Sequence, residues 1–372
     1  MSGEQHTPGT SAKRSRTATV AELRPRYQAD LAQGTERFFD RRRTDCPWCG
    51  STRLRERLRT PDLFQHKPGR FFLDECQQCG HVFQNPRLNG AGLEFYYRDF
   101  YDGLGEKDLD GVFTGPGREK MYRRRAESLK PFDRTPKNWL DVGTGHGHFC
   151  ATARTVFPGT AFDGLDFSAG IELAERAGRI DRGFRGGFTE LARQELLGRY
   201  DAVSMYHYLE HSTDPRGELR AAWQAIHPGG HLLIEVPDPQ SRLARVLGRW
   251  WLPWLQPQHL NFLPVANLRQ ELTALGFTVV AEEHAEPHDT VDLLGAVWLS
   301  LNAVAPPEDA PWLTTPTDRI HRLLRAALLL AGVPALLLAT TLDRLLVKPI
   351  AHRLGLSNAY RVIARRPETP PG

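Results

Sequence analysis

Three glycines at alternate positions, Gly143, Gly145 and Gly147, follow an apolar run that contains Asp141. In an open parallel sheet, ligands bind beyond the carboxyl ends of the strands, where glycine lets the backbone come close to them. Asp166 ends the next apolar run, at the place where a carboxylate can accept hydrogen bonds from both hydroxyls of a ribose. The pattern predicts a crevice that binds a nucleoside.

Two different kinds of loop use glycines in a similar way. An ordinary tight turn needs glycine for the same conformational freedom. A dinucleotide dehydrogenase carries Gly-x-Gly-x-x-Gly and directs a helix N-terminus at a pyrophosphate. In this chain the third glycine, Gly147, comes one residue earlier than that fingerprint requires. The spacing therefore speaks against a dinucleotide.

Three later segments add to the glycine pattern. They are Leu209-Glu210-His211 after an apolar run, the Pro-Gly-Gly turn at 228–230, and His259 with Phe262 before a helical stretch. Together with the glycine loop and Asp166, these segments resemble the class I S-adenosylmethionine-dependent methyltransferases over about residues 138–282. The resemblance implies an α/β fold with a Rossmann-like, mostly parallel sheet whose last strand is antiparallel. It also implies S-adenosyl-L-methionine as the cofactor.

The resemblance also indicates which residues hold that cofactor. Many relatives carry an acidic residue after the third strand to hold the adenine amine, but the corresponding stretch here is 184–188, without an acid. We therefore expect the backbone and Phe188 to hold the adenine. The predicted cofactor-binding residues are Asp141, Gly143, Gly145, Gly147, Asp166, Phe188 and Tyr206.

Methyl transfer to oxygen or carbon needs a base, and histidine is the commonest one near neutral pH. His207, His211 and His259 are the candidates. His259 ranks first, because related sugar C-methyltransferases use a histidine in a similar setting before a phenylalanine; a structural role is its alternative. His211 ranks second, with a loop-fixing role as its alternative. Tyr97 could close over the sulfonium or the acceptor, since an aromatic face attracts a cation, or it could pack in the core.

Two Cys-x-x-Cys pairs, each followed by glycine, precede the glycine loop. Four thiolates are the usual ligands of a closed, structural zinc site. Redox chemistry or independent thiols are the alternatives. We expect a zinc ribbon that forms a small independent module. Its predicted ligands are Cys46, Cys49, Cys76 and Cys79.

Short apolar runs alternate with helical stretches after residue 138, which predicts βαβ units. Strands are expected at 138–143, 161–167, 200–206, 231–236, 277–282 and 360–364. Helices are expected at 147–156, 169–177, 214–226 and 265–275. The predicted organisation is a disordered tail (1–26), the zinc ribbon (45–87), an aromatic connector with a basic helix (88–137), the methyltransferase core (138–285), and an apolar helical insertion with the final strand (286–366).

Two apolar segments have no assigned place in that core. Residues 323–346 include an uncharged run broken by Pro334, and residues 246–255 contain three tryptophans. A helix or helical hairpin lying at a membrane interface and burial against the domain are both consistent with the first segment. The second could meet a membrane interface or cover an apolar substrate, or pack in the core. A transmembrane span is disfavoured, because the final strand would then lie on the wrong side of the membrane.

Composition limits the function. The formal charge is +4, from 48 basic and 44 acidic residues, which is too small for a dedicated nucleic-acid binder. Cysteine usage favours a reducing compartment, so we expect a cytoplasmic protein, in contact at most with the inner face of a membrane. The leading hypothesis is methyl transfer to an oxygen or carbon of a small molecule, sugar or lipid-linked glycan. An RNA methyltransferase that uses the ribbon and the arginine runs 41–43 and 123–125, or a scaffold protein without catalysis, are the alternatives.

Overall fold

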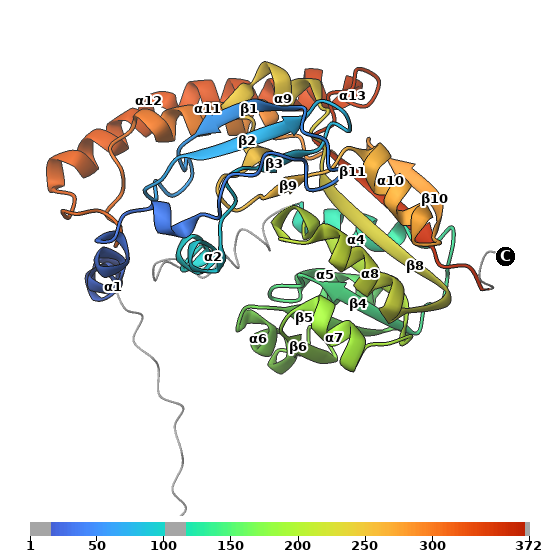
Figure 1. Cartoon of the computed structure of the whole chain (residues 1–372). Coiled ribbons are helices and arrows are strands. Elements are labelled where there is room, and N and C mark those ends of the chain that lie inside the picture. Colours follow the sequence, from blue (N-terminus) through green and yellow to red (C-terminus); the bar gives the residue numbers. More distant parts are fainter. Residues whose placement is uncertain (1–15, 101–116, 369–372) are drawn as a thin grey trace, which may run out of the picture.

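The computed structural model describes residues 16–100 and 117–368. A large sheet is built from strands between Asn138 and Arg365, and a smaller sheet lies above it (Figure 1). The strands of the large sheet are β4 (Asn138–Val142), β5 (Ala161–Asp166), β6 (Arg182–Arg185), β7 (Tyr200–Tyr206), β8 (Ile226–Pro237), β10 (Thr278–Glu283) and β11 (Ala359–Arg365). Their order is β10-β11-β8-β7-β4-β5-β6.

The pairing confirms the predicted fold class. Neighbours from β8 to β6 are parallel, whereas β11 runs antiparallel to both β8 and β10. All six predicted strands form. Sequence analysis did not predict β6 or the helix after it, because this edge strand has only four residues, two of them arginine.

Helices cover both faces of this sheet. The α-helices in the described residues are α1 (Arg16–Leu31), α2 (Gly90–Tyr97), α4 (Arg118–Glu127), α5 (His148–Val156), α6 (Gly170–Arg176), α7 (Phe188–Gln194), α8 (Pro215–Ala225), α9 (Arg242–Val246), α10 (Val265–Ala274), α11 (Asp292–Val304), α12 (Arg319–Leu342) and α13 (Lys348–Ile350). Residues of α4, α5 and α6 share one buried cluster with the sheet, and residues of α7, α8 and α10 share another. Burial on both faces explains why the middle residues of the parallel strands are mostly apolar.

The smaller sheet corrects the prediction of an independent ribbon. It consists of β1 (Leu54–Thr60), β2 (Phe71–Cys76), β3 (Val82–Gln84) and β9 (Asn261–Phe262), all antiparallel. The last strand belongs to the segment that carries His259, and Gln84 N donates to Leu260 O at 2.9 Å. The cysteine region is therefore joined by a shared sheet to the segment between β8 and α10.

The predicted disordered tail is wrong from Arg16 onward. Helix α1 begins there, and Val20 and Tyr27 are buried. Tyr27 donates its hydroxyl to Asp99 Oδ2 at 2.9 Å, so distant partners stabilise a segment with weak local signals. Residues 1–15 lie outside the described part of the chain.

The apolar C-terminal segment forms α12, which runs beside α11 at the top of the view (Figure 1). Pro334 lies inside α12 without ending it, and a π-helical turn, Asp343–Val347, leads into α13. Among the described residues, Arg319–Ile350 is the one helix whose length and composition would allow it to cross a membrane. Burial against the domain was one expectation, but only 11% of its apolar window is buried.

Candidate functional site

The predicted glycine loop joins β4 to α5 at the carboxyl end of the sheet. Gly143, Gly145 and Gly147 have φ angles of 77°, 53° and 75°, a region that side chains disfavour. A Cβ on Gly143 would lie 2.7 Å from Cδ2 of Tyr208. A Cβ on Gly145 would meet no atom within 4 Å, so this glycine borders open space. The loop thus has backbone exposed where a ligand could approach.

Asp166, at the end of β5, is bonded to this loop. Its Oδ2 accepts a hydrogen bond from Gly145 N at 2.9 Å, and its Oδ1 accepts one from Ser168 N at 2.8 Å. Each carboxylate oxygen has a second lone pair for a ligand hydroxyl. The structure therefore brings the two features predicted from sequence together.

Asp141 lies beneath the loop. It is buried, and Ser204 donates its hydroxyl to Asp141 Oδ1 at 2.5 Å. Burial raises the pKa of Asp141 to about 6. Trp139 donates its indole N–H to the same hydroxyl at 2.9 Å. This chain of bonds gives Asp141 a role in fixing the start of the loop.

Phe188 does not fit its predicted role. Its side chain is fully buried in the core cluster of α7 and α8, so an adenine ring cannot contact it in this structure. Phe167 is instead 67% exposed and directly follows Asp166. Phe167 is therefore a candidate contact for the adenine ring, which sequence analysis missed. Its signal in the sequence was a large apolar residue directly after the predicted ribose ligand Asp166.

Tyr206, at the end of β7, is engaged with its own neighbours. Its ring packs edge-on against Phe149 with centroids 4.9 Å apart, and the Arg125 guanidinium lies 4.9 Å from its ring centroid. Its hydroxyl donates to Arg125 O at 3.3 Å. The residue therefore braces the site between α4 and α5.

Tyr97, His211 and His259 come together from three distant segments; we call them the Tyr97–His211–His259 group. The Tyr97 hydroxyl lies 2.8 Å from His211 Nδ1 and 2.8 Å from Gln258 O. His211 and His259 meet edge to face with ring centroids 4.6 Å apart. Helix α2, the turn after β7 and the segment before β9 supply these side chains. The aromatic connector is thus part of the site.

The protonation of these two histidines follows from their partners. His259 Nδ1 lies 2.7 Å from Pro253 O, an acceptor, so Nδ1 carries the proton and Nε2 keeps its lone pair. Burial, then the neighbouring His211, lowers the pKa of His259 to about 3. Burial also lowers the pKa of His211. Both rings are therefore neutral at neutral pH, and each has a nitrogen that can accept a proton.

His207, the third candidate, is excluded as a base by its surroundings. Its ring nitrogens lie 3.1 Å from Glu210 Oε1 and 3.4 Å from Glu235 Oε1. Partial removal of the ring from water opposes the charged form, yet hydrogen bonds to these carboxylates raise the pKa of His207 to about 9, and 42% of the side chain remains exposed. The protonated ring is a cation in an ion-pair network, which Arg125 and Arg361 extend by binding Glu235.

The four predicted metal ligands cluster as expected. One sulfur from each of Cys46, Cys49, Cys76 and Cys79 lies within 4.8 Å of the others. Each pair forms the same knuckle, in which the amide of the following glycine donates to the carbonyl of the first cysteine, at 2.9 Å and 2.8 Å. This donor set and spacing fit a tetrahedral zinc ion. One donor atom from each of Glu210, His211 and His259 also lies within 4.8 Å of the others.

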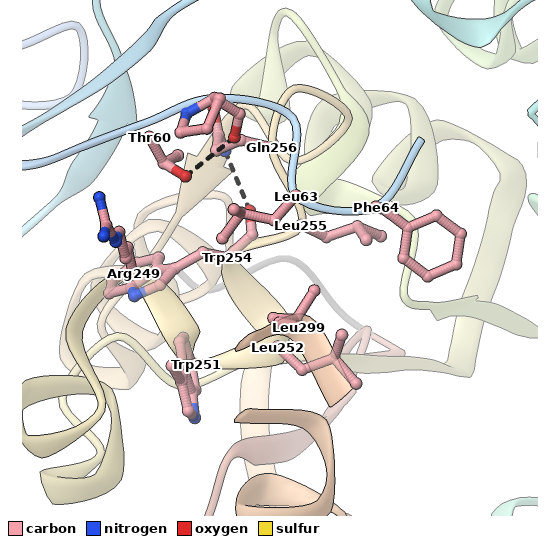
Figure 2. A pocket seen from close by; sticks show the side chains of 11 residues that line it. Thr60, Leu63, Phe64, Arg249, Trp251, Leu252, Trp254, Leu255, Gln256 and Leu299 are labelled. Carbon is pink, nitrogen blue, oxygen red and sulfur yellow. Dashed lines mark hydrogen bonds between the residues drawn. The ribbon is translucent and has the colours of Figure 1, made fainter. Parts of the chain in front are cut away.

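The tryptophan segment is mostly core. Trp251 and Trp254 are buried, with their indole N–H groups bonded to Asp292 Oδ1 and Gly248 O. They line a small pocket together with Leu63, Leu299 and other apolar residues (Figure 2). Its volume of about 20 Å³ has room for about one water molecule and excludes an acceptor.

Comparison with known proteins agrees with the fold and the loop. Residues 117–282 match the family described as "Methyltransferase domain". A ubiquinone biosynthesis O-methyltransferase from Alkalilimnicola ehrlichii is 29% identical over 126 residues, 32% of this chain and 50% of that protein. A demethylmenaquinone methyltransferase from Thermus thermophilus is 30% identical over 136 residues, 36% of this chain and 61% of that protein. Residues 117–282 are therefore similar to a methyltransferase domain.

The match has a limited extent. This chain spans between half and two thirds of the length of those two relatives. A solved methyltransferase structure from Archaeoglobus fulgidus is 17% identical and covers 69% of this chain and 97% of that one, with a TM-score of 0.44. The cysteine region and α12 lie outside the segment that matches the family.

Proposed function

We propose that this chain transfers the methyl group of S-adenosyl-L-methionine to an oxygen or carbon of a small acceptor. The observation that carries the proposal is the hydrogen bond between the glycine loop and Asp166, at the same end of the sheet as the turn that carries His211. Asp166 would hold the ribose, and the exposed ring of Phe167 would contact the adenine. The bound cofactor would supply an electrophilic methyl group.

The Tyr97–His211–His259 group would bind the acceptor and remove its proton. We propose that His211 is the base that accepts the acceptor's proton. His259 has a pKa of about 3, and a base with so low a pKa has little driving force at neutral pH. Tyr97 would hold the ring of His211 through its hydroxyl. The rest of catalysis is alignment of the acceptor with the methyl group and exclusion of water.

We also propose a structural zinc ion on the four cysteines. A site with four thiolates has no open position for a substrate. Its contribution to function is indirect, since the sheet that it stabilises includes β9 and borders His259. The two relatives are named for steps in quinone biosynthesis, which is consistent with an acceptor of apolar, aromatic type.

The RNA methyltransferase alternative has weaker support. A cavity of about 210 Å³ between the ribbon and the segment after β7 is lined by arginines. However, Arg43 pairs with Asp45 and Arg216 pairs with Glu271. In the second arginine run, Arg125 is buried against Glu235. These charges have carboxylate partners, which reduces their attraction for phosphate.

Calorimetric titration with S-adenosylhomocysteine tests the proposal. We expect binding by the intact chain and at least about tenfold weaker binding by Asp166→Ala, since a hydrogen bond to a charged group contributes about 1.5–3 kcal/mol. Glu195→Ala, an exposed carboxylate at the end of α7, is the matched control and should bind normally. Folded wild-type protein that binds no S-adenosylhomocysteine would contradict the proposal.

A further inference from the structure

Helix α12 and the turn after it expose an unusual amount of aliphatic surface. The described residues include eighteen large, exposed apolar side chains, and eleven of these lie between Ile320 and Leu354. Leu330 is 73% exposed and Leu337 is 63% exposed. An apolar surface of this extent on one element marks a contact site for a partner or a membrane.

Only a narrow stripe of α12 packs against the protein. Gly332 and Ala339, about two turns apart, are its two buried residues. A Cβ on Gly332 would lie 2.4 Å from Leu301 of α11, which shows how closely the two helices approach. Asp343, just beyond α12, accepts hydrogen bonds from the backbone of Leu293 and Leu294 at 3.1 Å and 2.9 Å. The other faces of α12 therefore point away from the body.

Both ends of α12 are attached to the same body. Near its start, Arg325 donates to Asn302 Oδ1 at 2.7 Å, and Asn302 donates to Leu63 O of the ribbon region at 2.8 Å. At its end, the chain returns to the large sheet as β11, between β8 and β10. A helix that crossed a bilayer would place these two attachments on opposite sides. The attachments instead hold α12 flat along one edge of the protein (Figure 1).

The charges along this helix have one sign. Arg319, Arg322, Arg344 and Lys348 are exposed and form no ion pair with the described residues, whereas Asp343 is fully buried. Asp318, the N-cap residue of α12, is an exposed acid, and it accepts a hydrogen bond from the backbone N–H of His321. Basic side chains beside an apolar face complement the surface of a membrane that contains anionic lipid.

We propose that the outward face of α12 and α13 docks the protein in the interfacial layer of an anionic phospholipid bilayer. The leucines would enter the boundary between headgroups and acyl chains, and the arginines and Lys348 would contact lipid phosphates. The helix lies parallel to the membrane plane, so the site is held at the surface without a transmembrane segment. A second copy of this chain on the same face is the alternative occupant.

Co-sedimentation with vesicles tests this docking. The full chain should sediment with vesicles of phosphatidylcholine that contain phosphatidylglycerol, and more weakly with phosphatidylcholine alone. The double variant Leu330→Glu and Leu337→Glu should lose at least about tenfold in vesicle affinity, because two charges enter the apolar face. Leu173→Glu with Leu197→Glu is the matched control, since these leucines are also exposed but lie on other elements. This control should bind like the wild type.

Two further measurements separate the alternatives. Arg344→Gln with Lys348→Gln should lower the affinity for phosphatidylglycerol vesicles by about tenfold and weaken its salt dependence. Light scattering without lipid should show a monomer, and each variant should still bind S-adenosylhomocysteine, which reports on its fold. A dimer that Leu330→Glu dissociates, or a wild-type chain that fails to sediment with either vesicle, would overturn the proposal.

Discussion

The cofactor end of the large sheet and the Tyr97–His211–His259 group differ in how far apart along the chain their parts lie. Gly145, in the loop after β4, and Asp166, at the end of β5, are 21 residues apart. Tyr97 is 114 residues from His211 and 161 residues from Gln258. The first region depends on one βαβ unit, whereas the second needs α2, the ribbon sheet and the core in place together. Substitutions outside the βαβ unit should therefore affect methyl transfer to the acceptor more than they affect cofactor binding.

The largest effect is expected from loss of the metal ion. Cys49 is exposed, so Cys49→Ser removes a ligand while removing little packing. Zinc binding at such sites contributes to folding, so the sheet that includes β9 should loosen without the ion. Metal analysis should show that the variant has lost its zinc, and an activity assay should show that methyl transfer is lost. Its affinity for S-adenosylhomocysteine should be nearly unchanged. Cys150→Ala, outside the cluster, should keep its zinc.

Removal of the proposed base should have the next largest effect. His211→Ala should lower kcat by roughly 10²–10⁴-fold, the usual contribution of a general base, with unchanged S-adenosylhomocysteine affinity. His259→Ala should lower kcat less, because a ring whose pKa is about 3 has little driving force as a base at neutral pH. Transfer of labelled methyl groups to a panel of acceptors is the measurement. A greater loss of kcat in His259→Ala than in His211→Ala would indicate that His259, and not His211, is the base.

Substitutions of Phe188 and Phe167 should have different effects, one on the stability of the fold and the other on cofactor binding. Phe188→Ala should lower the free energy of unfolding by about 3–5 kcal/mol, because it empties a fully buried position. Phe167→Ala should change stability by less than about 0.5 kcal/mol and weaken S-adenosylhomocysteine binding about tenfold. Urea denaturation and calorimetry measure the two effects. Equal cofactor affinity in Phe167→Ala and the wild type would remove Phe167 from the site.

The smallest effect is a dependence of stability on pH. The pKa of His207 is about 9 in the folded protein, above the ordinary value of 6.5. Its stabilising contribution is therefore complete below pH 6.5 and disappears as the pH rises through about 9. His207→Gln should be less stable than the wild type near about pH 6 and equally stable near about pH 10 in urea denaturation. A difference independent of pH would indicate a packing effect instead.

Sequence analysis was most accurate where short segments determine their own geometry. The glycine loop needs positive φ angles, and the four cysteines occur as two repeated knuckles, so both could be recognised from a few adjacent residues. It was wrong for α1, whose Tyr27 is buried by partners far along the chain. It also separated the ribbon from the core, because two residues, Asn261 and Phe262, give no visible strand signal.

The sequence by itself determined the cofactor end of the sheet, the positions of its main strands along the chain and the four-cysteine cluster. Local backbone conformation and the alternation of apolar residues specify these features, since each depends on nearby residues. Tertiary structure alone decided that His207 is a cation, that Phe188 is core, and that α12 exposes its leucines. Burial and charge partners decide those properties, and both come from segments that meet only in the folded chain.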